Sequence, residues 1–330
     1  RAAAYSWVEI CDWLPAVLTG TEDPKAMKRS RCAAGHKAMW HEEWGGLPSE
    51  EFLVQLDPLL AGLRERLYQE TYTSDQRAGD LTSEWAAKLG LPAGIPVAVG
   101  AFDAHMGAVG GGITANTLVK IMGTSTCDVM VGSYEELAGK TVAGICGQVD
   151  GSVIPGMIGL EAGQSSFGDV YAWFRNVLSW PIEAIGPEIG LTPEQQASIR
   201  AKILERLTEA AAQVDPNETT VLALDWLNGR RTPDADQKLK GALIGLTLGT
   251  DAPRIFRALV EATAFGARAI VERFRDEGLQ IDQVIAQGGI PGKNEFVMQV
   301  SADVLGMPIK VVRSSQATAL GAAMFAAVAA

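Results

Sequence analysis

The sequence has little positive charge. Its 28 Lys and Arg are outnumbered by 39 Asp and Glu, which gives a formal net charge of −11. Binding to a phosphate backbone needs clustered basic residues, and anionic membrane surfaces also attract basic segments. The charge balance therefore argues against a nucleic-acid partner and against a membrane surface as a partner.

Cysteine is scarce. The chain has four cysteines, at Cys11, Cys32, Cys127 and Cys146, and none of them forms a C-x-x-C pair. Neither a zinc site nor a redox motif is indicated by this spacing. Four thiols in a chain of 330 residues favour a reducing compartment over a disulfide scaffold, so we expect a cytoplasmic protein.

Several other signals are missing. There is no signal peptide and no apolar run of transmembrane length, and the apolar tail 320–330 is short enough to be expected as a core helix. No G-x-x-x-x-G-K-[ST] loop is present, and no G-x-G-x-x-G follows a strand, which excludes Walker-type and Rossmann sites. His36 and His41 have no matching third ligand in the sequence, so we expect no metal site.

Both ends of the sequence look cut. The chain opens at Arg1 without a Met, and it stops inside the apolar stretch 317–330 without a capping glycine. We therefore expect an internal piece of a longer protein.

Glycine, by contrast, is abundant, with 36 of 330 residues, or about 11% against a usual ~7%. Glycine serves where a backbone turns sharply or approaches a ligand, which points weakly to a phosphate or nucleotide protein. The length corresponds to about two domains. The triple glycine 110–112 is the best candidate for the hinge and boundary, which divides the chain into 1–112 and 113–330.

The periodicity predicts an α/β protein. Before the glycines, the pattern predicts helices over 1–20, 49–67 and 82–89 and a buried strand over 96–101. After them it predicts two hairpin strands over 117–122 and 127–131 and a glycine-rich strand region over 141–160. Helices follow over 166–180, 193–213 and 253–278, and then a strand–helix–strand unit over 284–312 and a helix from 317. Paired strands followed by βαβ units indicate an α/β domain.

Three polar residues are candidates for contact with a substrate. Asp103 sits where a strand ends and a helix begins, so its carboxylate could accept a proton from a substrate hydroxyl, or it could simply be an N-cap. Lys37 could hydrogen-bond sugar hydroxyls or be a solvated lysine. Glu161 lies among glycines after an apolar strand and could bind a polyol or serve as a structural, ion-paired glutamate.

Two glycine-rich turns are candidates for contact with a nucleotide. The turn Gly123-Thr124-Ser125 could surround phosphate oxygens with N–H groups and hydroxyls, or it could be a plain hairpin turn. Gly288 and Gly289 end a strand just before Asn294 opens a helix. A flat ligand could approach the bare backbone there, although a flexible loop would look the same.

Taken in order, these segments resemble the FGGY family of carbohydrate kinases. The resemblance rests on segments that span nearly the whole chain: Tyr5-Ser-Trp-Val-Glu-Ile-Cys-Asp, Arg31-Cys-Ala-Ala-Gly-His-Lys, Trp44-Gly-Gly-Leu-Pro, Phe102-Asp-Ala-His-Met-Gly, Gly123-Thr-Ser-Thr-Cys, Glu161-Ala-Gly-Gln-Ser, Leu224-Asp-Trp-Leu-Asn-Gly-Arg-Arg-Thr-Pro and Ala319-Leu-Gly-Ala-Ala. It implies two actin-like, ribonuclease-H-like domains with a cleft between them. Residues 1–112 would be the remainder of the sugar-binding N-terminal domain, and 113–330 the nucleotide-binding C-terminal domain.

The resemblance also implies roles for the candidate residues. Asp103 matches the family's catalytic base, and Lys37 and Glu161 match positions near the sugar. The turn Gly123–Ser125 matches a phosphate-binding turn. The segment with Gly288, Gly289 and Asn294 matches the one that binds adenosine.

The implied reaction is ATP-dependent phosphorylation of a 2-ketopentose, with L-ribulose as the expected acceptor, in arabinose catabolism, and with Mg²⁺ as cofactor. A homodimer is a possible assembly that the sequence does not establish. Two alternatives stay open: a kinase of another ketose or polyol in the same family, and a non-catalytic actin-like nucleotide-binding module.

The sequence departs from the family pattern in two places. The family's Asp-x-Gly-Thr hairpin, which serves phosphate and Mg²⁺, is absent, and we expect it upstream of Arg1. Gln316 stands where many members carry Glu before the Ala-Leu-Gly run.

Overall fold

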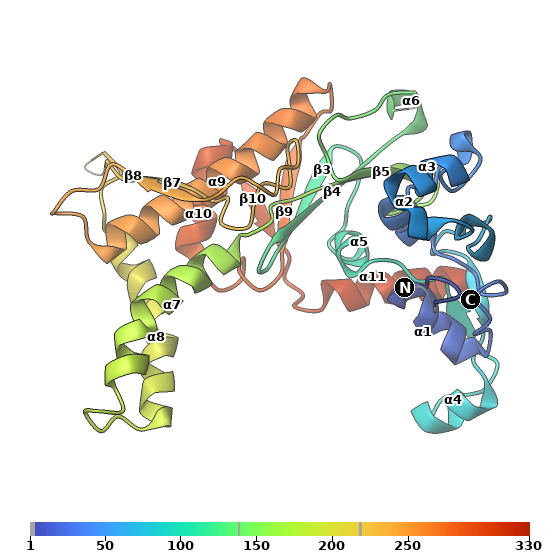
Figure 1. The fold of residues 1–330 in the computed structure, drawn as a ribbon, viewed down its shortest axis with the longest axis horizontal. Coiled ribbons are helices and arrows are strands. Elements are labelled where there is room, and N and C mark those ends of the chain that lie inside the picture. The colour runs from blue at the N-terminus through green and yellow to red at the C-terminus, as the bar shows by residue number, and fades with distance from the viewer. Residues whose placement is uncertain (1–3, 138, 218–219) are drawn as a thin grey trace.

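A six-stranded sheet forms the centre of an elongated molecule (Figure 1). The computed structural model describes residues 4–137, 139–217 and 220–330. The strands are β3 (Thr117–Met122), β4 (Thr126–Gly132), β5 (Gly147–Asp150), β6 (Ile158–Ala162), β9 (Gln283–Gln287) and β10 (Ile309–Val311). They lie in the order β10-β9-β3-β4-β6-β5. The pairs β10–β9 and β9–β3 are parallel, and the other three pairs are antiparallel.

Both faces of this sheet are covered, and the alternation along the strands shows why. Leu118 and Met130 face one layer of helices, while their neighbours Val119 and Val129 face the other. Successive strand residues point to opposite faces, so a run that is apolar at every position must be buried on both sides. The expected α/β class is confirmed.

One charged pair lies within this apolar sheet. Lys120 and Asp128 are directly opposite each other on β3 and β4 and are 1% and 0% exposed. Their Nζ and Oδ2 atoms are 2.5 Å apart. Each charge is compensated only by the other, since a lone ion there would have no water to solvate it.

The first helical layer contains α9 (Ala252–Asp276) and α10 (Glu295–Leu305). Asp251 caps α9, Asn294 caps α10, and Gly306 ends α10 in the left-handed conformation. Beyond them, α7 (Gly168–Ile185) and α8 (Pro193–Ala212) form a hairpin that projects away from the sheet (Figure 1). A capping box between Thr192 and Gln195 starts α8 where the sequence predicts a helix. The short strands β7 (Leu222–Leu224) and β8 (Ala242–Ile244) pair beside α9.

The second layer contains α5 (Asp103–Gly110) and α11 (Ala317–Ala329), which lie in close contact. A Cβ at Gly110 would overlap the carbonyl oxygen of Ala317, and a Cβ at Gly321 would overlap that of Met106. The expectation that the apolar tail is a core helix is wrong. Ala317, Gly321 and Phe325 are the buried residues of α11, whereas Leu320, Met324 and Val328 face outward.

The N-terminal region is less regular than the sequence predicts. It contains α1 (Ile10–Thr19), α2 (Arg31–Ala38), α3 (Glu50–Leu56), α4 (Ser83–Leu89) and the antiparallel pair β1 (Arg77–Asp80) and β2 (Pro96–Ala98), and α6 (Tyr134–Leu137) follows β4. The helix expected over 49–67 breaks after Leu56, because Asp57 starts a new 3₁₀ turn at Pro58. Of the helix expected over 1–20, residues 1–3 lie outside the described part of the chain and residues 4–9 are not helical. The helix begins at Ile10 and stops before Gly20, the expected end.

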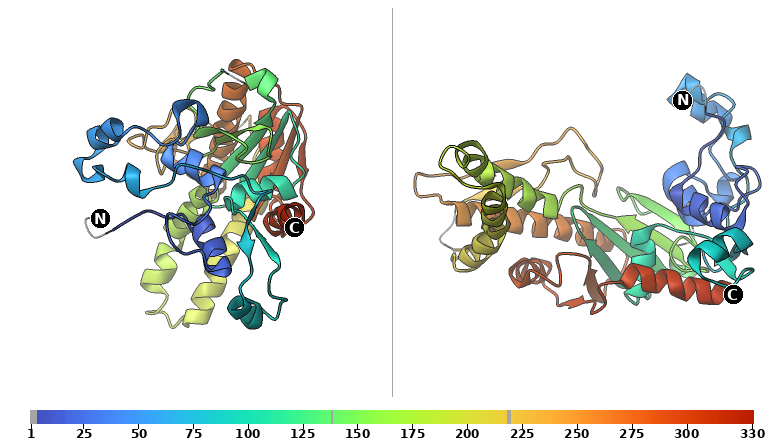
Figure 2. Two further views of the ribbon diagram at one scale, coloured as in Figure 1. Left: turned by 90° about the vertical axis from the view of Figure 1, so that its right-hand side faces the viewer. Right: turned by 90° about the horizontal axis from the view of Figure 1, so that it is seen from below.

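Both ends of the chain lie at the end of the molecule opposite the α7–α8 hairpin (Figure 2, right). The triple glycine connects α5 to β3, and its role as a hinge stays a prediction. None of the described helices has the length and apolarity that crossing a membrane requires.

The contact between α5 and α11 gives a first testable prediction. Gly110→Ala puts a methyl group against the Ala317 carbonyl, so we expect a loss of about 3 kcal/mol, the upper end for overpacking. Gly292→Ala is the control, because a Cβ there meets nothing within 4 Å and should change stability by less than about 0.5 kcal/mol. Urea unfolding measures both. Equal stability of the two variants would contradict the close contact.

Candidate active site

The first cluster of polar residues forms around Glu161 on β6. Ile158, Leu160 and Ala162 of this strand face the α9 layer. The alternate positions, Gly159 and Glu161, therefore face the α5 layer, and the glycines around Glu161 leave room for large neighbours. A Cβ at Gly147, which pairs with Glu161, would overlap the His36 ring.

The carboxylate of Glu161 lies between three cationic or potentially cationic groups. Arg231, from the loop after β7, binds Oε1 through its Nη2. Oε2 lies 3.3 Å from His105 Nε2 and 3.6 Å from His36 Nδ1. Burial alone would raise the pKa of Glu161, but His105, His36 and Arg231 together hold it well below its usual range. Glu161 is therefore a fixed anion.

Further contacts hold the two histidines in place. His105 on α5 is fully buried, and its Nδ1 lies 2.7 Å from Cys32 Sγ on α2. His36 on α2 lies 3.3 Å from Ser152 Oγ through its Nε2. Burial, together with the nearby His105, lowers the pKa of His36 to about 3, so His36 is neutral. Burial also disfavours the charged form of His105. The nearby Cys32 and Glu161 outweigh this effect, so the pKa of His105 is raised.

Asp103 and Lys37 lie at the edge of the same cluster. Both side chains are exposed. Lys37 Nζ is 5.3 Å from the centre of the Phe102 ring, and that ring centre is 5.8 Å from the centre of the His105 ring. Lys37 and Asp103 thus stand on α2 and α5, the two helices whose histidines contact Glu161.

The alternative interpretation of Asp103 as an N-cap is wrong. Phe102 occupies the N-cap position of α5, and Asp103 is the first helical residue. Its Oδ1 accepts a hydrogen bond only from the adjacent Ala104 N–H, at 2.8 Å. The exposed carboxylate remains available to a ligand.

The second cluster is formed by the β3–β4 turn and the loop after β9. Gly288 has a φ of +109°, and a Cβ there would overlap the carbonyl oxygen of Met122, just before the turn. Carbonyl oxygens of the turn also accept hydrogen bonds from the start of α7, including Phe167 N–H to Thr124 O at 2.7 Å. Thr124 and Gly289 are exposed. Gly123, Thr124, Ser125, Gly288 and Gly289 therefore form one surface.

Asn294 has structural partners instead of a free side chain. Its Oδ1 accepts from Val297 N–H at 3.0 Å and caps α10, and its Nδ2 donates to Thr208 Oγ1 on α8 at 3.2 Å. A contact between Asn294 and a nucleotide stays a prediction.

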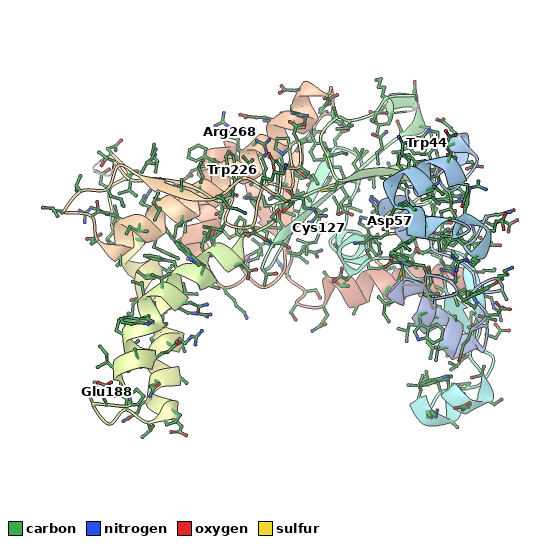
Figure 3. All side chains as sticks on the ribbon, viewed as in Figure 1. Trp44, Asp57, Cys127, Glu188, Trp226 and Arg268 are labelled. Atoms are coloured by element: carbon green, nitrogen blue, oxygen red, sulfur yellow. The ribbon has the colours of Figure 1, made fainter. Side chains whose placement is uncertain are left out.

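The two clusters lie on adjoining strands. Val129 on β4 pairs with Glu161, and Ser125 precedes Val129 by four residues, or about 13 Å along a strand. Cys127 lies between them and is labelled in Figure 3 at the centre of the molecule, between its two halves. A ligand on the turn and a ligand at Glu161 could therefore be neighbours.

The sequence did not predict the partners of Glu161. His105 stands two residues after Asp103, and Arg231 lies in the Asn-Gly-Arg-Arg segment, so both were within recognised segments without a role. His36 lies close to two further potential ligands, whereas His41 lies outside this group. Ligand atoms of His36, His105 and Glu161 lie within 4.8 Å of one another.

Comparison with known proteins identifies the family. The family model described as the FGGY family of carbohydrate kinases, C-terminal domain, matches residues 118–330. The chain therefore belongs to the FGGY family of carbohydrate kinases.

Two relatives are similar along almost the whole chain. A protein named ribulokinase from Vibrio parahaemolyticus is 55% identical over 330 residues, which cover 99% of this chain and 58% of the relative. A ribulokinase from Shouchella clausii is 43% identical over 99% of this chain and 55% of the relative. The chain thus spans somewhat more than half the length of these relatives.

Solved structures support the actin-like kinase fold. A xylulose kinase from Brucella ovis superposes with a TM-score of 0.75 at 22% identity, covering 99% of this chain and 60% of that one. Plasmodium falciparum glycerol kinase with ADP superposes with a TM-score of 0.69 at 17% identity, and the match covers 98% of this chain and 57% of that one.

The Glu161 cluster gives a second prediction. Folding lowers the pKa of Glu161 from its ordinary value of 4.5. The ionised carboxylate therefore adds to the free energy of unfolding above pH 4.5, and this contribution is lost as the pH falls below 4.5. Glu161→Gln should remove this acid-sensitive component and cost about 3 kcal/mol at neutral pH, since His105 and Arg231 lose their partner. Urea unfolding between pH 3 and pH 7 measures both effects.

The matched control is Glu183→Gln. Glu183 pairs with Arg200 at 2.7 Å, but it is half exposed. Its loss should cost at most about 1 kcal/mol and leave the acid dependence unchanged. A variant at Glu161 that retains the wild-type pH profile would show that the buried contacts do not hold this carboxylate ionised.

Proposed function

We propose that the complete protein containing this chain transfers a phosphoryl group from ATP to a hydroxyl of a 2-ketopentose, with L-ribulose as the preferred acceptor. The observation that carries the proposal is that α2 and α5, which bear Lys37 and Asp103, place their histidines against Glu161, on the strand next to β4 and its glycine-rich turn. The naming of the two relatives as ribulokinases supports the choice of sugar.

The proposed sugar site would act by positioning the sugar and by accepting a proton from it. Asp103 would accept the proton of the attacking hydroxyl, for which an exposed carboxylate with one local hydrogen bond is suited. Glu161 would accept hydrogen bonds from other hydroxyls. Because Arg231 and His105 already hold its carboxylate, it would need no reorganisation when the sugar binds.

This sugar site would lie across the proposed domain boundary. Lys37, His105 and Asp103 belong to the proposed N-terminal domain, residues 1–112, whereas Glu161 and Arg231 belong to residues 113–330. The sugar would thus contact both domains, while the nucleotide would lie against the second.

The residues present fit a nucleotide. Gly289 and Gly292 have open space where a Cβ would stand, so a ligand can reach the backbone there. The turn at Gly123 adds backbone N–H groups and the hydroxyls of Thr124 and Ser125. ATP bound there would supply the phosphoryl group, and the turn would orient its phosphates.

Mg²⁺ is proposed as the companion of ATP. It prefers oxygen ligands and is usually held in part by substrate phosphates. The hydroxyls of the turn and the carboxylate of Asp169 at the start of α7 are oxygen donors of the right kind, and Asp169 N–H already donates to Thr124 O at 3.0 Å. The ion would neutralise phosphate charge during transfer.

The leading alternative is another acceptor in the same family. A test of the acceptor is coupled ADP release by the complete gene product, with L-ribulose, D-ribulose, L-xylulose, D-xylulose and glycerol. Release that depends on a ketopentose and is fastest with L-ribulose supports the proposal. Faster release with another acceptor changes the substrate. ATP binding without any acceptor-dependent release would favour a non-catalytic nucleotide-binding module.

Asp103→Asn provides the third prediction. It preserves the shape of the side chain but removes the proton acceptor, so turnover should fall by about 10²- to 10⁴-fold while ATP affinity stays near wild type. The control is Asp276→Asn, an exposed change at the end of α9 that should leave turnover unchanged. Wild-type turnover of Asp103→Asn would dismiss Asp103 as the base.

The Gly289→Val variant provides the fourth prediction. A side chain there meets no protein atom within 4 Å, so the fold should be unaffected while the bulk blocks a ligand from the backbone. We expect ATP affinity to drop by at least ~10-fold, about 1.4 kcal/mol, with sugar affinity unchanged. Gly249→Val is the control, because a Cβ there meets only Thr247 Oγ1 at 3.8 Å and Gly249 lies outside the proposed nucleotide site. Calorimetric titration measures both, and unchanged ATP affinity would remove Gly289 from the nucleotide site.

A further inference from the structure

Two histidine nitrogens and one carboxylate oxygen point at a common position in the Glu161 cluster. His105 Nε2 and His36 Nδ1 lie 3.3 and 3.6 Å from Glu161 Oε2. Both ring nitrogens are buried. His36 Nδ1 makes no hydrogen bond to any described residue, whereas His105 Nε2 faces the Glu161 carboxylate alone. Two buried imidazole nitrogens therefore meet one fixed anion.

The hydrogen bonds of His36 define its tautomer. Ser152 Oγ donates its one proton to Val149 O at 3.1 Å. With that proton donated to Val149 O, Ser152 Oγ accepts from His36 Nε2–H, which lies 3.3 Å away. In the neutral imidazole the other nitrogen then carries a lone pair. His36 Nδ1 thus directs a lone pair at a carboxylate, an arrangement that a cation between them would stabilise.

His105 can present the same kind of donor. Its Nδ1 lies against Cys32 Sγ at 2.7 Å, so an Nδ1–H can donate to the sulfur. An ion that displaces the proton from Nε2 would then find the Nε2 lone pair directed at Glu161. Metal-binding histidines usually donate their second N–H to such a partner, which fixes the ring. The two nitrogens of a ring point in different directions, so Cys32 supports His105 without sharing an ion with it.

We propose that His36, His105 and Glu161 bind a divalent transition-metal ion, with Zn²⁺ as the favoured ion. Two imidazoles and one carboxylate form a ligand set that Zn²⁺ accepts, with a fourth position open to water or substrate. The separations of 3.3 and 3.6 Å are close to those between neighbouring ligands about 2 Å from one ion. Mg²⁺ is disfavoured, because it prefers oxygen ligands.

Arg231 opposes this binding but does not prevent it. It contacts Oε1 of Glu161, whereas the histidines face Oε2, so the ion and the guanidinium use different oxygens. The Arg231 side chain is 34% exposed, which lets water screen its charge.

The consequence for activity rests on the proposed function, whereas metal binding itself does not. If Glu161 receives sugar hydroxyls, an ion on Oε2 occupies the place of the sugar. Zn²⁺ should then inhibit competitively with the ketopentose and leave ATP affinity unchanged.

The first experiment measures Zn²⁺ binding to the metal-free protein by titration against a chromophoric chelator, with Mg²⁺ as the comparison ion. We expect one Zn²⁺ per chain and at least a ~10-fold loss of affinity in His36→Gln and in Glu161→Gln. His41→Gln is the matched control, because His41 is the third histidine of the chain and lies outside the cluster. Its affinity should equal that of the wild type.

Absorption of the Co²⁺-loaded protein tests the ligands without any activity. We expect visible bands of a four-coordinate site and no thiolate charge-transfer band. Circular dichroism shows which variants fold, and the partly exposed His36 keeps the test open if a His105 variant does not. Absence of stoichiometric Zn²⁺, equal affinity in His36→Gln, or a thiolate band would overturn the metal site.

Kinetics separate the two proposals. Zn²⁺ inhibition that is competitive with sugar and absent in His36→Gln supports both. Stoichiometric binding at the cluster without inhibition confirms the metal site and contradicts the sugar position at Glu161. Sugar-competitive inhibition that persists in His36→Gln contradicts the metal site and leaves the sugar position intact.

Discussion

The buried carboxylate of Glu161 is the point at which distant segments of the chain are held together. It receives Arg231 from the loop after β7 and faces His36 from α2 and His105 from α5. An anion without water must be compensated by such partners, and the partners are positioned by it in turn. The position of α2 against the sheet, the start of α5 and the geometry of the proposed sugar site all depend on this one charge.

The local structure could largely be predicted from the sequence. Periodicity predicted α8 and α9, and the apolar segments on either side of the Gly123 turn predicted β3 and β4, because these signals act within a few residues. The helix expected over 49–67 failed because apolar spacing continued past Asp57 and Pro58, where the backbone cannot stay helical. The prediction of a core helix at the C-terminal tail was wrong for another reason. Packing of α11 on α5 determines which of its apolar residues are buried.

The sequence predicted those residues of the candidate site that stand in recognisable motifs. Asp103, Lys37 and Glu161 were proposed from motifs and resemblance, and the structure places Lys37 and Asp103 on the helices whose histidines contact Glu161. The roles of His105 and Arg231 were not predicted. For Arg231 the reason is that 70 residues separate it from Glu161, so their contact follows from strand order and register. The sequence did not reveal the structural partners of Asn294, whose side chain caps α10 and binds α8, and its contact with a nucleotide stays a prediction.

The pair Lys120–Asp128 has a consequence for how the sequence can change. Replacing one partner leaves a charge unpaired in the sheet, at a cost of about 3–5 kcal/mol, whereas replacing both with apolar residues of similar volume is often neutral. In a scan of single substitutions each position would therefore look immutable. A library that varies both positions at once should yield folded variants, so evolution can cross between the charged and the apolar version only by a double step.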